Sequence, residues 1–127
     1  MIVVDTSALM AILLGEAEAD ACIGVLEAET EILISSVTMA EALIVANRRN
    51  VAQEMASLID GLGMSIVAVT PAFAKQVAEA YARWGKGIHP AGLNFGDCFS
   101  YALAKEHSCR LLFVEDDFSR TDVEGIL

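Results

Sequence analysis

Short, continuous apolar runs recur along this chain, and each one leads into a segment with helical periodicity. The runs lie at residues 2–4, 32–34, 65–70 and 111–113, and they lack the regular polar alternation of strands that face water on one side. Strands of this kind are buried on both faces, as in parallel sheets covered by helices. The pattern therefore predicts an α/β fold whose central, mostly parallel sheet of four or five strands is flanked by helices.

Helical segments fill the spaces between these strands. One helix follows Asp5 directly, and Pro71 suits the first turn of another, where its missing N–H is not needed. Residues 85–96 carry four glycines and Pro90, which predicts a long loop, and loops of this length tend to be functional. Residues 123–127 could add a short edge strand. The other predicted helices are residues 18–29, 37–49, 50–61, 71–84 and 95–107.

The length of 127 residues fits one domain, residues 1–127, with a core of its own. An apolar share of 55 % excludes a disordered chain. No apolar run approaches the roughly 18 residues that cross a bilayer, and the basic segment of a signal peptide is missing. The three cysteines are an odd number without a Cys-x-x-Cys pair, so we expect reduced thiols in a cytoplasmic protein with no membrane partner.

The chain is strongly acidic, with 8 Lys and Arg against 18 Asp and Glu and a formal net charge of −10. This charge argues against a protein that binds nucleic acid through a basic patch, because phosphate neutralisation depends on clustered Lys and Arg. It does not exclude an enzyme whose bound cations meet the phosphates.

Asp5 stands where parallel sheets bind their ligands, at the carboxyl end of a strand, and Asp97 stands at the start of the helix after the glycine-rich loop. Asp5 follows the first strand, where it could also cap the next helix, although Thr6 or Ser7 could serve as the cap instead. Asp97 is the third residue of a helix that Asn94 would cap, and an acid there suits the helix dipole. Both acids therefore fit a local structural role as well as a functional site.

Glu41 lies in a helix that is apolar on nearly every side over its first ten residues, so we expect that helix to be buried. A buried carboxylate needs a partner. Arg48, two turns along the same face, is one candidate, and a divalent cation shared with other acids is the second. Thr38, one turn before Glu41, could support the carboxylate.

Asp116 and Asp117 follow the fourth strand, where either one alone fits an ordinary turn. Together with Asp5, Glu41 and Asp97 they bring acids from four parts of the chain to one edge of the sheet. Like charges gathered in this way repel one another, and Mg²⁺ or Mn²⁺, which prefers oxygen ligands, relieves the repulsion. The acids therefore predict a metal centre.

The same residues resemble the PIN-domain family, and more closely its VapC-like toxin ribonucleases from bacterial toxin–antitoxin pairs. The resemblance covers essentially the whole chain and implies a PIN-like three-layer fold. Its most specific part is NFGDCFSYALA at residues 94–104. The matching segments are 2–8 (IVVDTSA), 35–42 (SSVTMAEA), 85–87 (GKG), 89–104 (HPAGLNFGDCFSYALA), 111–113 (LLF) and 116–122 (DDFSRTD).

The resemblance implies that Asp5, Glu41 and Asp97 hold the metal, with Asp117, or else Asp116, as the fourth acid. It implies a Mg²⁺-dependent endoribonuclease that leaves a 5′ phosphate, with Mn²⁺ as a substitute ion. The residues expected to support the acids are Thr6, Ser7, Thr38 and Asn94.

One departure from the family pattern lies beside the presumed site. Relatives often have Lys-Gly before the acid pair, where this chain has Val114 and Glu115. The exchange removes a base and adds an acid. It leaves the identity of the fourth acid open.

The resemblance also implies an RNA substrate, a cognate antitoxin and a second copy of the chain in a homodimer. An antitoxin helix would fill an apolar groove and place an Arg or Lys in the acid cluster, and residues 18–29 and 50–61 are candidate surfaces. His89 and His107 are interpreted as structural or surface residues. The basic residues that could hold RNA are Arg48, Arg83, Lys86 and Arg120.

Two other functions compete with this hypothesis. One is a catalytically silent PIN-like module that only binds proteins as a dimer, and the extra acid Glu115 favours it. The other is a receiver-type phosphoryl-transfer domain, which needs a second acid close to Asp5, where this chain has Thr6 and Ser7. Metal-dependent RNA cleavage distinguishes the three. The sequence leaves open which RNA is cut and how many ions bind.

Overall fold

Four short strands form the centre of the computed structural model, which describes all residues 1–127. Their order in the sheet is β3-β2-β1-β4, and all three pairings are parallel. The predicted parallel sheet is therefore confirmed, with four strands. The strands are β1 (Ile2–Val4), β2 (Ile32–Ser35), β3 (Ser65–Val67) and β4 (Arg110–Leu112).

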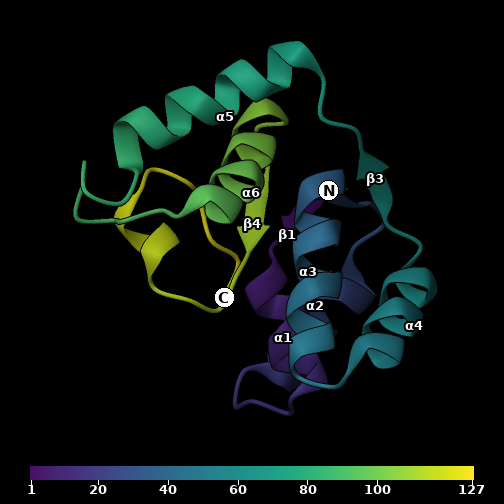
Figure 1. Cartoon of the computed structure of the whole chain (residues 1–127). Coiled ribbons are helices and arrows are strands. Elements are labelled where there is room, and N and C mark those ends of the chain that lie inside the picture. The colour runs from purple at the N-terminus through teal and green to yellow at the C-terminus, as the bar shows by residue number, and fades with distance from the viewer.

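Six α-helices and one 3₁₀ turn, η1 (Asp117–Arg120), surround this sheet (Figure 1). The five helices predicted with bounds begin and end within two residues of those bounds. None of the six combines the length and the apolar character needed to cross a bilayer. The helices are α1 (Thr6–Leu13), α2 (Ala19–Ala28), α3 (Ser36–Arg48), α4 (Ala52–Leu62), α5 (Pro71–Trp84) and α6 (Phe95–Glu106).

Successive strand residues point to opposite faces of the sheet and build two cores. Val3 and its register partners Leu33 and Leu111 pack with side chains of α5 and α6. Ile2 and Ile34 pack on the other face with side chains of α1 to α4. Because helices cover both faces, the strands are apolar at nearly every position. The expected free cysteines are Cys98 in the first core, Cys22 in the second and the partly buried Cys109.

The two edges of the sheet differ from the prediction. β3 ends at Val67 instead of residue 70, and its Ile66 is 51 % exposed, because an edge strand has a neighbour on one side only. Residues 123–127 do not form a fifth strand. They contribute a single bridge between Leu111 and Gly125, supported by a hydrogen bond from the Leu111 N–H to the Glu124 carbonyl at 2.9 Å.

The prediction that residues 37–49 form a helix buried on nearly every side is wrong. α3 buries Thr38, Ala42 and Ala46 along one face, but Ile44 is 55 % exposed. The reason is that α1, α4 and α6 pack around one part of α3 and leave the rest open. Apolar side chains of α3 therefore border solvent close to Glu41.

The glycine-rich segment between α5 and α6 is held in a defined shape. The Lys86 N–H donates to the Leu93 carbonyl at 2.9 Å, and Gly85 and Leu93 form a bridge. Gly87 and Gly92 have φ angles of +85° and +64°, which residues with a Cβ rarely adopt. The segment thereby delivers the first residues of α6 to the carboxyl edge of the sheet.

Candidate metal centre

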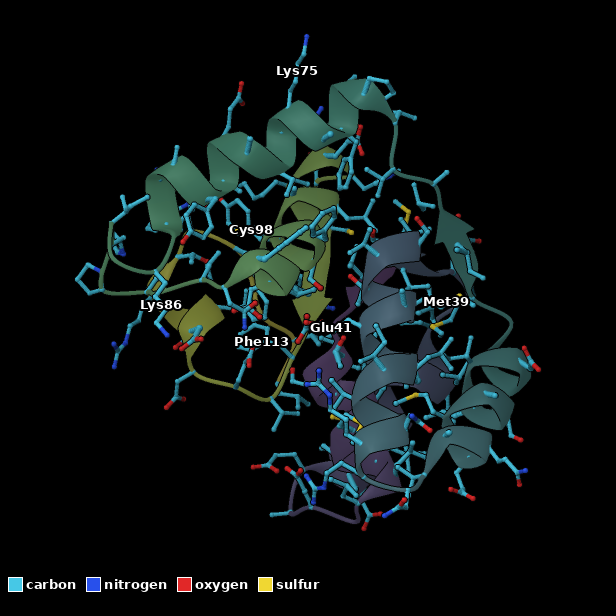
Figure 2. The ribbon with its side chains drawn as sticks, in the orientation of Figure 1. Met39, Glu41, Lys75, Lys86, Cys98 and Phe113 are labelled. Atoms are coloured by element: carbon cyan, nitrogen blue, oxygen red, sulfur yellow. The ribbon has the colours of Figure 1, made fainter.

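The carboxyl ends of β1 and β4 lie side by side, and the chain returns to this edge through α3 and α6. Asp5 directly follows β1, and its N–H donates to the Leu112 carbonyl of β4 at 3.0 Å. Glu41 belongs to α3 and Asp97 to the first turn of α6. Figure 2 shows Glu41 pointing from α3 toward the start of α6. The fold thus gathers three of the predicted acids at one edge.

Asp5 is the N-cap of α1 and is only 2 % exposed. Its Oδ2 accepts hydrogen bonds from the Ser7 N–H at 3.0 Å and the Ser7 hydroxyl at 2.7 Å. Its Oδ1 accepts from the Ser100 hydroxyl at 2.6 Å, and Ser7 Oγ accepts from the Val114 N–H at 3.1 Å. The Asp5 side chain therefore caps α1 and also lies at the proposed site. Its orientation is fixed by Ser7 and Ser100.

Asp97 is 4 % exposed and is fixed by the cap of α6. Asn94 Oδ1 accepts from the Asp97 N–H at 2.8 Å, while Asp97 Oδ2 accepts from the Asn94 N–H at 3.0 Å. The predicted Asn94 cap is confirmed. Only the second of these bonds involves the Asp97 carboxylate, and it uses Oδ2, so Oδ1 can face the other acids.

Glu41 takes its hydrogen bond from α1 and not from its own helix. The Thr6 hydroxyl donates to Glu41 Oε1 at 2.6 Å. The Thr38 side chain faces α6, with its hydroxyl 3.4 Å from Ser100 Oγ, and makes no hydrogen bond to Glu41. The Thr38 carbonyl instead lies 3.4 Å from the same Thr6 hydroxyl. Arg48 forms no ion pair with Glu41.

Gly96, beside Asp97 in α6, lies directly against the Glu41 carboxylate. A Cβ built at this glycine would be 2.0 Å from Glu41 Oε2. This separation is far too short for two nonbonded atoms. The approach of Glu41 to the start of α6 therefore depends on the missing side chain.

Glu115 completes the closest group of carboxylates. One oxygen each from Asp5, Asp97 and Glu115 lie within 4.8 Å of one another. Asp117, at the start of η1, is outside this trio, and Asp116 is exposed. Glu115 Oε1 is buried and has no hydrogen-bond partner.

Burial and mutual repulsion act together on these acids. Burial raises the pKa of Glu41 and Asp97, and the charge of Asp5 adds to both shifts. Burial, the adjoining Asp97 carboxyl and the charges of Asp5 and Asp117 raise the pKa of Glu115 to about 9. No Lys, Arg or His forms an ion pair with Asp5, Glu41, Asp97, Glu115 or Asp117. The centre therefore holds negative charge that the chain itself does not compensate.

Ser100 and Glu115 were not among the predicted site residues. Ser100 lies three residues after Asp97, a spacing that places both on one face of α6, so the sequence did carry a signal for it. Glu115 stood out only as a departure from the family pattern. Its burial depends on the path of the chain after β4, for which residues 113–117 contain no local signal.

The two histidines lie away from the acid trio, in the roles that the sequence predicted. His89 Nδ1 accepts from the Ala91 N–H at 3.0 Å, and the imidazole packs edge-on against Trp84 with ring centroids 4.7 Å apart. His107 follows the end of α6 and lies 3.9 Å from a Glu106 oxygen. Both are structural or surface residues.

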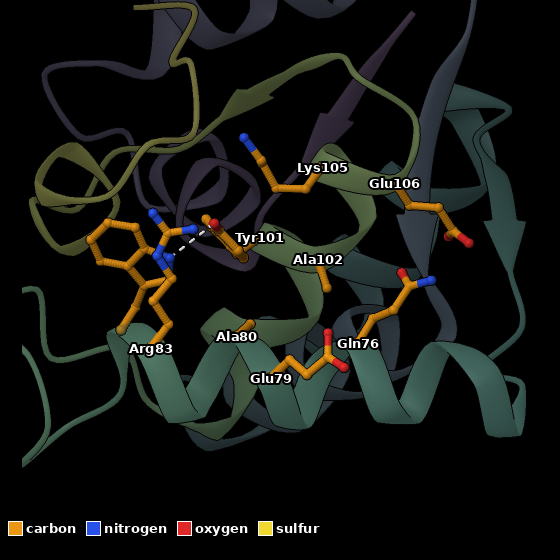
Figure 3. A pocket seen from close by; sticks show the side chains of 9 residues that line it. Gln76, Glu79, Ala80, Arg83, Tyr101, Ala102, Lys105 and Glu106 are labelled. Carbon is orange, nitrogen blue, oxygen red and sulfur yellow. Dashed lines mark hydrogen bonds between the residues drawn. The ribbon is translucent and has the colours of Figure 1, made fainter.

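A second polar groove separates α5 from α6, and none of the site acids lines it (Figure 3). Arg83 and Lys105 face the same Asp122 carboxylate at 3.7 and 3.3 Å. Trp84 Nε1 donates to the Tyr101 hydroxyl at 2.9 Å, and Tyr101 donates to Asp122 at 2.5 Å. The two basic side chains of this groove are thus paired within the chain, in contrast to the acids of the trio.

Comparison with known proteins places this chain in a family. A family model described as PIN domain matches residues 2–124, and the chain belongs to that family. It is 39 % identical over 127 residues to Ribonuclease VapC of Mycolicibacterium smegmatis, covering 98 % of both chains. It is 38 % identical over 127 residues to Ribonuclease VapC30 of Mycobacterium tuberculosis, covering 98 % of this chain and 97 % of the relative.

Solved structures agree with this assignment at the level of the fold. VapC20 of Mycobacterium tuberculosis, described as a sarcin–ricin loop cleaving toxin, superimposes with a TM-score of 0.79 at 21 % identity, covering 99 % of this chain and 98 % of that one. VapBC2 of Rickettsia felis, bound to a promoter DNA fragment, gives a TM-score of 0.71 at 18 % identity, covering 100 % and 98 %. The predicted PIN-like fold is confirmed.

Proposed function

We propose that this chain is a divalent-metal-dependent endoribonuclease of the VapC type, the toxin of a toxin–antitoxin pair, and that residues 1–127 form one domain. The observation that carries the proposal is the trio of close carboxylates from Asp5, Asp97 and Glu115, with Glu41 beside the start of α6. Relatives 38 and 39 % identical over nearly the whole chain bear the name ribonuclease VapC, which supports RNA as the substrate.

The residues of the centre fit a hard divalent cation. All donors are carboxylate oxygens, the ligand type that Mg²⁺ and Mn²⁺ prefer. Asp5 and Asp97 are almost fully buried, and one buried oxygen of Glu115 has no partner in the chain. Buried carboxylates that no basic side chain neutralises are stable only when another positive charge compensates them. A proton does so without metal, and a divalent cation would do so for several carboxylates at once.

The chain's own residues prepare this site before any substrate arrives. Ser7 and Ser100 hold the two oxygens of Asp5, and the Asn94 cap holds one oxygen of Asp97. Thr6 holds Glu41. When bound, Mg²⁺ or Mn²⁺ would supply a Lewis acid that stabilises charge on the scissile phosphate and lowers the pKa of a water molecule. Fixed carboxylates lower the reorganisation that this reaction would otherwise require.

Local cations beside the acids would hold the RNA despite the acidic surface. Arg83 is engaged with Asp122, and Arg120 donates to the Pro90 carbonyl at 3.2 Å. Lys86 and Arg48 form no ion pair, and each lines a groove together with Phe95, two residues before Asp97. We therefore assign RNA phosphate contacts to Lys86 and Arg48 in preference to Arg83 and Arg120.

The proposed protein partners are an antitoxin and a second copy of the chain. Similar folds have been solved as toxin–antitoxin complexes, including one from Klebsiella pneumoniae. We assign an antitoxin helix to the apolar groove between α2 and α4, which is lined by Ile23 and Leu58 and lies in the two predicted candidate surfaces, residues 18–29 and 50–61.

RNA cleavage by the purified, antitoxin-free chain tests the proposal. We expect discrete cuts in total cellular RNA with Mg²⁺ or Mn²⁺ and none with EDTA, and sequencing of the new 5′ ends would identify the target. Asp97→Asn is expected to lower the cleavage rate by about 10³-fold, because a metal contributes several kcal/mol to the barrier.

Glu106→Gln serves as the matched control, since Glu106 is an exposed acid at the other end of α6. It should cleave like the wild type. Cuts that persist in EDTA, or that Asp97→Asn makes at the wild-type rate, would contradict the metal-dependent mechanism. A folded, metal-loaded sample that makes no cuts would favour a silent binding module.

Gly96→Ala is expected to lower the affinity for Mn²⁺ by about 10- to 100-fold, the usual effect of displacing a residue that supports a metal site. The new Cβ would displace the Glu41 carboxylate, which lies at the end of a flexible side chain and can swing away. The free energy of unfolding should hold or rise slightly, because alanine favours a helix over glycine by up to about 1 kcal/mol.

Isothermal titration with Mn²⁺ and urea unfolding measure these two effects of Gly96→Ala. The control is Gly61→Ala, also within a helix, where an added Cβ meets no atom within 4 Å. Gly61→Ala should preserve metal affinity. Equal affinities in both variants would show that the position of Glu41 does not matter for the cation.

A further inference from the structure

Glu115 is the one acid of the centre whose presence the family pattern does not explain. It lies between β4 and η1, three residues after Leu112, the last residue of β4. Its carboxylate nevertheless reaches the acids at the ends of β1 and α6, since one oxygen each from Asp5, Asp97 and Glu115 lie within 4.8 Å of one another. The chain after β4 thus contributes a side chain to the middle of the site.

Hydrogen bonding distinguishes Glu115 from the other acids. Asp5, Asp97 and Glu41 each accept hydrogen bonds at 2.6 to 3.0 Å from the chain. Glu115 Oε1 is the only buried side-chain nitrogen or oxygen in the structure that has no partner. Leaving a buried polar atom unpaired costs about 1–3 kcal/mol, and more for a charged group. A bound species that pairs with this oxygen would remove that cost.

The chemistry around this oxygen defines the missing partner. One oxygen of Glu115 lies within 4.8 Å of an oxygen of Asp5 and of an oxygen of Asp97, and no basic side chain forms an ion pair with these acids. An anion or a neutral acceptor would add to the repulsion. A small cation with oxygen ligands would instead satisfy three carboxylates at once.

Asp117, the acid that the family pattern designates, has a different environment. It begins η1, and its carboxylate does not belong to the trio. It influences the site through its charge, which contributes to the raised pKa of Asp97 and of Glu115. Its own oxygens are not left buried without partners.

We infer that Glu115 takes over from Asp117 as the carboxylate that binds a divalent cation together with Asp5 and Asp97. The inference rests on the proposed metal-dependent function. It assigns the third close carboxylate ligand of the centre to Glu115, at a position where relatives often have a glycine. The side chain of Glu115 is longer than that of aspartate by one methylene, so a glutamate two residues earlier in the chain still reaches the site.

Mn²⁺ binding to the full chain, measured by isothermal titration without RNA, tests this assignment. Glu115→Gln is expected to weaken Mn²⁺ binding by at least about 10-fold, whereas Asp117→Asn should change it by less than about 3-fold. Glu124→Gln, the same exchange at an exposed glutamate, should bind like the wild type. Asp97→Asn provides the reference for a lost ligand.

The rise in Tm on adding Mn²⁺ gives a second readout, because a ligand that binds only the folded state stabilises it. Glu115→Gln should keep its fold, since glutamine has nearly the same shape as the glutamate side chain. Wild-type affinity in Glu115→Gln together with a loss in Asp117→Asn would overturn the inference and leave the metal site in place. A wild-type chain that binds no Mn²⁺ would instead overturn the metal site as a whole.

Discussion

Exchange of Asp5 for asparagine is expected to lower metal-dependent RNA cleavage by about 10³-fold or more while the free energy of unfolding stays close to that of the wild type. Asparagine removes the charge that would bind the cation. It keeps an oxygen that can accept the Ser7 N–H bond, and it caps helices about as well as aspartate does. It also removes one of several carboxylates that repel one another. Loss of this charge therefore does not lower the free energy of unfolding of the metal-free protein.

Asp5→Ala separates the two roles of this side chain. Alanine also loses the cap, worth about 1 kcal/mol, and leaves the Ser7 and Ser100 hydroxyls without their acceptor. We therefore expect equal loss of cleavage in both variants but a loss of stability of about 2–4 kcal/mol in Asp5→Ala alone. Cleavage and urea unfolding of the same samples measure this. Cleavage by Asp5→Asn near the wild-type rate would reduce Asp5 to a helix cap.

The parts of the centre that the sequence predicts are those with local signals. Asp5 and Asp97 each sit in a helix cap next to an apolar strand or helix, and that short-range pattern fixes both position and orientation. In both cases the observed cap is compatible with the proposed role in the site. A cap requires the carboxylate to point back at the start of the helix, and the starts of α1 and α6 meet at the carboxyl edge of the sheet.

The parts that the sequence does not predict depend on contacts between distant segments. Glu41 has a partner on α1, Thr6, because packing of α1 against α3 decides which side chains meet. The prediction that α3 is buried fails for the same reason. An apolar helix indicates that its side chains favour burial, but it does not indicate which neighbouring elements pack against it. The site position of Glu115 is harder still to predict from sequence, because a residue after a strand becomes part of the site only when the residues that follow anchor it in place.

Phe118 is that anchor, and its exchange for alanine is expected to lower the free energy of unfolding by about 3–5 kcal/mol. The side chain is fully buried and packs against Phe113 with ring centroids 5.1 Å apart, in the core between the sheet and α5 and α6. Removing it leaves a cavity that the surrounding strands cannot close. A loss of this size is a large part of the about 5–15 kcal/mol by which domains are stable.

Urea unfolding followed by the fluorescence of the single tryptophan, Trp84, measures the effect of Phe118→Ala. Phe95→Ala is the matched control, since Phe95 is 60 % exposed, and it should cost about 1 kcal/mol or less. Phe118→Leu retains most of the volume and should cost about 1 kcal/mol, so it shows a graded effect even where alanine prevents folding. Because Phe118 follows Glu115 by three residues, Phe118→Leu should also weaken Mn²⁺ binding more than Phe95→Ala does. Equal stability losses in Phe118→Ala and Phe95→Ala would contradict the anchoring role, and with it the account of how Glu115 is held beside Asp5 and Asp97.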